Sequence, residues 1–128
     1  MAEFPSDAWF EALHTSVARA SHTWSSTIDE PIVVEMVVRP LRSQTHAEDT
    51  EVRWHLRIAA HDLVVQRGAA EHPTVTVFTD QSVIEDLSDG TLNAQLAIDR
   101  NRLKVRGDLN RLATLGPALT VLTTALTP

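Results

Sequence analysis

The spacing of hydrophobic residues predicts a helix at the start of the chain and strands after it. Over residues 6–25, apolar side chains recur every three or four positions, which is the period of a helix with one buried stripe. Residues Glu51–Ala59 instead alternate between apolar and polar, which indicates a strand with one buried and one solvated face. Such a strand is typical of an antiparallel sheet that other elements cover on one side.

Four more segments have the length and residue types of strands. They are Ile32–Arg39, Leu63–Arg67, Pro73–Thr79 and Leu103–Arg106. The second follows Glu51–Ala59 after a short turn, so we expect these two strands to pair as a hairpin. Pro31 and Pro40 bracket the first strand, which predicts an edge or terminal place in the sheet, because proline donates no hydrogen bond to a neighbouring strand. Residues 42–50 are polar and are predicted to form a loop.

Helices are predicted around the last of these strands. Asp80 is placed to cap the start of one helix, and Asp89-Gly90 to end it. A second short helix follows, and a last helix over Asp108–Leu126 has leucines at spacings of three and four, with a kink or break expected at Gly116-Pro117. Helices with one apolar stripe need a sheet beneath them. The chain is therefore predicted to be a single α+β domain over residues 1–128, with a five-stranded, mainly antiparallel sheet and helices on one face.

Composition narrows the class of protein and its partners. The chain has 128 residues and a formal net charge of −6, which argues against nucleic-acid binding. It has no cysteine, its first residues lack the basic and apolar regions of a signal peptide, and no apolar run approaches the ~20 residues that span a membrane. We therefore expect a cytoplasmic protein without stable membrane insertion. Arginine outnumbers lysine ten to one, which indicates a bacterial source with a GC-rich genome.

The sequence holds no set of side chains that predicts catalysis. The phosphate-binding glycine loops, dinucleotide fingerprints and serine-nucleophile motifs of common enzymes are absent. A metal site built from His55, His61 and His72 is geometrically conceivable, but solvated surface histidines are favoured. Glu85 and Asp86 point in different directions on their helix, which favours a solvated face over a catalytic pair. We expect neither an enzyme nor a bound cofactor or metal.

An ordered set of segments resembles one known family. Trp54–Ile58 has the form Trp-x-Leu-x-Ile, and the short strand after it is closed by Gly68. Pro73–Asp80, a helix that ends at Asp89-Gly90, and the stretch Asn101–Leu109 follow in the same order and spacing as in that family. Taken together, these segments make the chain similar to the sterol carrier protein type 2 domain, a family of lipid-binding domains.

The resemblance extends from about Pro31 to Leu119, and two of its turns depart from the family pattern. Ala60-His61-Asp62 stands where the family usually has a glycine, which leaves the type of that turn open. Asn101-Arg102 stands where the family usually has Gly-Lys. Asparagine adopts the left-handed backbone conformation more readily than other non-glycine residues, so we expect this turn to be preserved.

The resemblance implies a hydrophobic cavity between the sheet and the helices, closed by the C-terminal helix. Its ligand would be an apolar small molecule such as a fatty acid, an acyl-CoA or a sterol-like lipid, bound or transferred without catalysis. The residues predicted to line the cavity are Met36, Trp54, Leu56, Phe78, Leu87, Leu96, Leu103, Leu112, Leu115 and Leu119. Arg100, Arg102 or Arg106 would meet a carboxylate head group at a mouth, although exposed positions are favoured for all three.

Two alternatives stay open at this point. In the first, the same fold has a filled core and serves as a protein-interaction or dimerisation module, for instance as an accessory part of a lipid- or steroid-metabolising enzyme. In the second, ranked lower, acidic or histidine side chains inside the cavity catalyse a reaction. The segment after Pro117 also has two readings of about equal weight, a movable cover and an ordinary packing helix.

Overall fold

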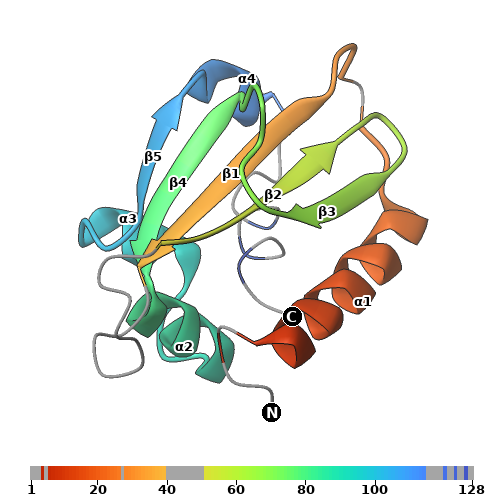
Figure 1. Cartoon of the computed structure of the whole chain (residues 1–128). Coiled ribbons are helices and arrows are strands. Elements are labelled where there is room, and N and C mark those ends of the chain that lie inside the picture. Colours follow the sequence, from red (N-terminus) through yellow and green to blue (C-terminus); the bar gives the residue numbers. More distant parts are fainter. Residues whose placement is uncertain are drawn as a thin grey trace.

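Five strands form one mixed sheet in the computed structural model, which describes Phe4, residues 6–26, 28–39 and 51–114, and Thr120, Thr123 and Leu126. The strands are β1 (Ile32–Arg39), β2 (Val52–Ile58), β3 (Leu63–Arg67), β4 (Val75–Asp80) and β5 (Lys104–Gly107). They lie in the order β3–β2–β1–β4–β5 (Figure 1). Among these pairs, β1 and β4 are parallel and the other three are antiparallel. The predicted α+β class and mainly antiparallel sheet are confirmed.

The helices begin and end at residues that the sequence marks as caps. They are α1 (Asp7–Thr23), α2 (Gln81–Asp89), α3 (Ala94–Asp99) and α4 (Leu109–Ala113). The Ser6 side chain accepts the N–H of Trp9 at 3.1 Å, and the Asp80 carboxylate accepts that of Val83 at 3.2 Å. Gly90 ends α2 in the left-handed conformation, with φ 84°. Both α1 and α2 lie on the same side of the sheet (Figure 1).

The central strand of the sheet is β1, which corrects the edge or terminal place that its flanking prolines suggested. It pairs with β2 on one side and with β4 on the other. Pro31 stands before the first paired residue, Ile32, so it removes no hydrogen bond from the ladder. A central strand is covered on both faces, and β1 shows this at Val37, which is only 2% exposed although it points away from the helices. Pro40, the predicted loop over residues 42–50 and the Gly116-Pro117 break lie outside the described residues.

Strand alternation builds the core on the helix-covered face. Met36 of β1 stands opposite Trp54 of β2 and beside Val77 of β4, and all three side chains have 0% exposure. The α1 helix packs against β3. It contributes the buried stripe Trp9, Phe10, Leu13 and Val17. The interior of the described part is one continuous hydrophobic cluster.

Two polar turns lie in the segment between β4 and β5. Asn101 has φ 57°, so it takes the left-handed conformation expected from the sequence and occupies a position where glycine would be unstrained. At the end of α2, the backbone N–H and then the hydroxyl of Thr91 donate hydrogen bonds to Asp89 and lower the pKa of that carboxyl below its usual range. These bonds are present above the ordinary pKa of an aspartate and are lost as pH falls through the lowered pKa.

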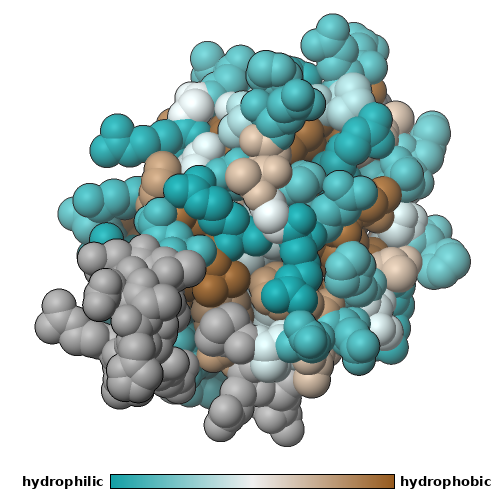
Figure 2. Space-filling view, viewed as in Figure 1, coloured by the Kyte–Doolittle hydropathy of each residue, from teal (hydrophilic) through white to brown (hydrophobic). Residues whose placement is uncertain are grey.

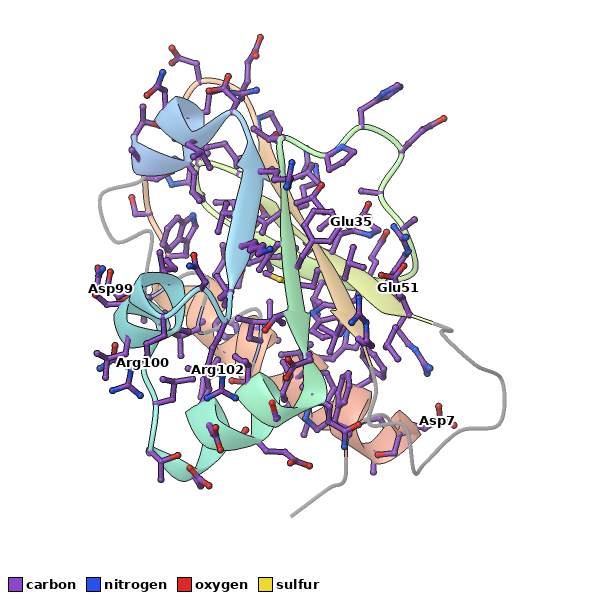
Figure 3. The ribbon with its side chains drawn as sticks, turned by 90° about the vertical axis from the view of Figure 1, so that its left-hand side faces the viewer. Asp7, Glu35, Glu51, Asp99, Arg100 and Arg102 are labelled. Atoms are coloured by element: carbon purple, nitrogen blue, oxygen red, sulfur yellow. The ribbon has the colours of Figure 1, made fainter. Side chains whose placement is uncertain are left out.

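A buried carboxylate holds a loop on the open face of the sheet. Glu35 of β1 points away from the helices, yet it is only 5% exposed. One of its oxygens accepts Nη1–H of Arg53 at 3.0 Å, and the other accepts the backbone N–H of Ala70 at 2.9 Å. Figure 3 shows Glu35 beside the connection between β3 and β4. Since both oxygens are used, this side chain fastens residues 68–73 to the central strand.

We expect Glu35→Ala to lower the free energy of unfolding by about 1–3 kcal/mol, because it leaves a partly buried backbone N–H without its acceptor. Urea denaturation followed by circular dichroism measures the change. The matched control is Glu51→Ala, since Glu51 also pairs with Arg53, at 3.1 Å, but on the surface. Its expected cost is below about 0.5 kcal/mol. Equal losses in the two variants would contradict the anchoring role of Glu35.

Candidate functional site

The structure brings three of the predicted site residues together on the helix-covered face. Met36, Trp54 and Leu56 lie on adjacent positions of β1 and β2 with 0% exposure. Trp54 is the largest fully buried side chain of the described part. Since Trp54 and Leu56 are two residues apart on one strand, their side chains point the same way. The alternation seen in the sequence was sufficient to predict that Trp54 and Leu56 share this face.

Three aromatic rings pack around Trp54 with edge-on geometry. The centroids of Phe4, Trp9 and Phe10 lie 5.7, 5.3 and 5.5 Å from that of Trp54, at interplanar angles of 60–81°. Such offsets are the favoured arrangement of aromatic side chains. The outer side of the cluster is covered by Arg67, whose guanidinium carbon lies 4.2 Å from the centre of the Phe10 ring. The start of α1 is thereby fixed to β2 and β3.

The other predicted lining residues lie in several different environments. Leu103 and Leu112 are buried, at 2% and 5% exposure, and belong to the core. Leu87 of α2 is partly buried and packs against it. Leu96 of α3 is 36% exposed. The remaining two, Leu115 and Leu119, lie outside the described residues, as does most of the C-terminal segment that was expected to close the cavity.

Phe78 does not face the helix-covered interior, and this removes it from the predicted lining. It stands beside Val37 of β1 and opposite Lys104 of β5, both on the open face, and it is 37% exposed. The physical reason is alternation along β4. Because Val75 and Val77 point toward the helices, the side chain of Phe78 must point away from them.

A hollow of about 460 Å³ lies where the connection from α1 to β1 meets α4. Ile28 and Ile32 form its apolar part, and Ile32 is also a fully buried member of the core. The polar part of its lining comes from Asp29, Glu30, Arg111 and Thr114. The lining of this hollow therefore combines a member of the hydrophobic core with charged side chains.

Arg111 of α4 joins the two segments that border this hollow. Its Nη2 donates to the backbone carbonyl of Pro31 at 3.1 Å and to that of Glu30 at 3.4 Å, and it lies 3.8 Å from the Glu30 carboxylate. Sequence reasoning missed this residue. No local pattern marks it, because the partners are 80 and 81 positions apart in the chain.

None of the three arginines proposed at a mouth lines the hollow beside Arg111. Figure 3 shows Arg100 and Arg102 at the end of the molecule where α2 and α3 lie, away from Glu35. The guanidinium of Arg102 donates to Asp86 and to the Ser82 hydroxyl, at 3.0 Å each. These bonds join the connection between α3 and β5 to α2. Arg106 stands opposite Thr76 on the open face of the sheet. Arg100 is exposed at the end of α3.

Neither a metal-binding cluster nor a membrane-spanning helix is found among the described residues. Within that part of the chain, no three histidine or acidic side chains are close enough to hold a metal ion, so His55, His61 and His72 do not form one site there. None of the helices in this part has the length and apolar character needed to cross a membrane. On the face seen in Figure 2, hydrophobic residues appear as small separate areas among hydrophilic ones.

Comparison with solved structures identifies the fold. Sterol carrier protein 2 superposes with a TM-score of 0.64 at 19% identity, covering 97% of each chain. Palmitated SCP2L2 from Aedes aegypti gives 0.62 at 16% identity, covering 85% of this chain and 92% of the other. The sec-alkylsulfatase Pisa1 from Pseudomonas sp. gives 0.55 at 17% identity, where 89% of this chain matches 16% of the larger one. At these identities the likeness is one of fold.

The sequence itself carries the family assignment. A search of curated protein sequences found no significant match. The model of the SCP-2 sterol transfer family, however, matches residues 37–120, which include β2 to β5, α2, α3 and α4. The match covers more than half of the chain and agrees with the fold. The chain belongs to the SCP-2 sterol transfer family.

Proposed function

We propose that this protein reversibly binds a long-chain lipid, such as a fatty acid, an acyl-CoA or a sterol-like molecule, between the sheet and the helices. The observation that carries the proposal is the hollow of about 460 Å³, because its lining includes Ile32, a buried member of the hydrophobic core. Its volume lies within the roughly 300–1,000 Å³ of small-molecule sites. No reaction is part of the proposal. A cytoplasmic, bacterial setting is included on the strength of the sequence alone.

The apolar chain of the ligand supplies most of the binding free energy. Each CH₂ group removed from water is worth about 0.8 kcal/mol, so a long chain needs few polar contacts. The proposed lining on the interior side consists of Met36, Trp54, Leu56, Leu87, Leu103 and Leu112, with Leu96, Leu115 and Leu119 retained from the sequence prediction. The head group stays at the charged border of the hollow, beside Arg111.

Titration with a fluorescent fatty acid tests this function. We expect saturable binding of about one ligand per chain, displaced by unlabelled palmitate, with energy transfer from the buried Trp54 to the bound probe. Trp54→Phe identifies which part of the transfer comes from that residue. Absence of binding to acyl and sterol probes, in folded protein stripped of co-purified lipid, would reject the proposal.

A pair of matched variants locates the site. Ile28→Glu places a carboxylate in the apolar part of the hollow, and we expect it to weaken fatty-acid binding about tenfold or more, because burying a charge against a lipid chain is costly. Phe78→Glu makes the same chemical change on the open face and is expected to alter affinity less than about twofold. Thermal melting checks that both variants are folded. Equal effects would place the ligand elsewhere.

One observation favours a second role. The fold recurs as 16% of the length of an alkylsulfatase chain, so such a domain also exists as a small part of an enzyme. A protein-interaction role, as a dimer or beside an enzyme that handles lipids, is therefore the alternative. Sedimentation of the purified chain, with and without lipid, separates the two, because a ligand carrier is expected to keep the same mass when it is loaded.

A further inference from the structure

A second hollow lies on the open face of the sheet, on the side away from α1 and α2. It has a volume of about 300 Å³, and side chains of β1, β2 and β3 form its floor. Strand register sets Val33, Arg57 and Val64 in one row across these strands. His55 and Gln66 form the next row, and residues 70–72 close one side. The sheet itself separates this hollow from the helix-covered interior.

The walls of this hollow are fixed by hydrogen bonds. The buried Glu35 carboxylate holds the backbone N–H of Ala70 at 2.9 Å, which positions the loop over the sheet. Nδ1 of His55 lies 3.0 Å from the carbonyl oxygen of Gly68. Because a carbonyl only accepts hydrogen bonds, Nδ1 carries the proton and donates. The second ring nitrogen, Nε2, is then left for another partner.

The lining combines one guanidinium, two imidazoles and the Glu71 carboxylate with a small apolar floor. The side chain of Arg57 has no hydrogen bond or ion pair with any residue in the part of the chain that the structure describes. It stands between Val33 and Val64, and His55 and His72 lie at the same hollow. A guanidinium offers two parallel N–H donors that match a carboxylate. We propose that this hollow binds a small organic carboxylate whose compact apolar body rests on the two valines.

The size of the hollow restricts the ligand. A volume of about 300 Å³ corresponds to roughly ten water molecules, since each occupies about 30 Å³ in the liquid. A carboxylate of about ten non-hydrogen atoms is of the right size for this space. The inference concerns a different hollow, on the other face of the sheet from the lipid proposed for the interior, so either one stands if the other fails.

Titration of the ¹⁵N-labelled full chain with benzoate tests the site. We expect saturable shifts of the amide signals of His55, Arg57 and Ala70, with little change at residues of α1. Benzamide has the same ring without the charge, and it is expected to bind at least about tenfold more weakly, because it cannot form the charge-assisted pair with Arg57. Absence of saturable shifts at the hollow, or equal binding of benzamide, would overturn the proposal.

Three single substitutions sharpen this test. Arg57→Gln is expected to weaken benzoate binding about tenfold or more, whereas Arg106→Gln, on the same face but outside the hollow, changes it less than about twofold. Glu71→Gln removes the acidic side chain from the lining and is expected to strengthen binding about twofold. Weaker binding in Glu71→Gln, or equal losses at Arg57 and Arg106, contradicts a carboxylate site.

A fourth substitution keeps the test decisive if Arg57→Gln fails to fold. Val64→Glu lies at a 38% exposed position, so it is expected to leave the fold intact. It places a like charge on the floor of the hollow and is expected to abolish the benzoate-dependent shifts. Unchanged binding in folded Val64→Glu overturns the proposal as well.

Discussion

Replacing Trp54 with alanine is expected to lower the free energy of unfolding by about 3–5 kcal/mol, the largest loss that we predict for a core residue. Its side chain is fully buried, and the rings of Phe4, Trp9 and Phe10 lie 5.3–5.7 Å away. Deleting the indole leaves a cavity that three rigid rings cannot fill by small movements. The loss therefore includes both the transfer of the indole to water and the unfilled volume.

Urea denaturation monitored by far-ultraviolet circular dichroism measures this loss without depending on tryptophan emission. Trp24→Ala is the matched control. The Trp24 side chain is only partly buried, although its Nε1–H donates to the Ala59 carbonyl at 2.8 Å, so we expect a loss of about 1–2 kcal/mol. If Trp54→Ala costs no more than Trp24→Ala, the aromatic cluster does not have the stabilising role that its geometry indicates.

Gly107→Ala is expected to cost about 3 kcal/mol or more, because both the conformation and the surroundings of this residue exclude a side chain. Its φ is +114°, which side chains of L-residues rarely adopt. A Cβ atom there would lie 2.5 Å from the Thr74 carbonyl oxygen and 2.9 Å from Cα of Val75. Both are backbone atoms of the neighbouring segment, so relief requires β4 and β5 to separate.

Gly68→Ala isolates the steric part of this effect. Gly68 has a similar φ of +100°, but a Cβ atom at that position meets nothing within 4 Å. We expect about 1–2 kcal/mol from backbone strain alone, so the two variants should differ by at least about 1–2 kcal/mol in urea denaturation. Equal losses would mean that the close approach at Gly107 relaxes at little cost.

Local patterns were sufficient for most of the secondary structure. The bounds of β1 and β3 agree with the sequence prediction, and those of the other strands differ by one or two residues. Asp80 and Gly90 cap α2 as expected, and Asn101 takes the left-handed conformation. Each of these features depends on residues within a few positions of one another. Short-range hydrogen bonds and steric preferences are therefore sufficient to favour them.

The placement of the proposed site residues on the helix-covered face followed from the sequence only where alternation along one strand determines it. Trp54 and Leu56 followed from the pattern of β2, because residues two apart share a face. Phe78 was included although Val75 and Val77 alternate against it, and the structure places it on the open face. Leu96 has a helical spacing that fits a buried stripe but is 36% exposed. A short helix is oriented by what it packs against, and the sequence does not contain that information locally.

The sequence by itself determined which segments are helices and strands, the helix caps and the fold class. Through the ordered set of segments, it also determined the family. Only the tertiary structure decided that β1 is central, that Arg111 reaches carbonyls 80 and 81 positions away, and that His72 lies at the same hollow as Arg57. The reason is physical. Strand order and the meeting of distant side chains depend on long-range packing free energy, which is shared among many residues and leaves no periodic trace in the chain.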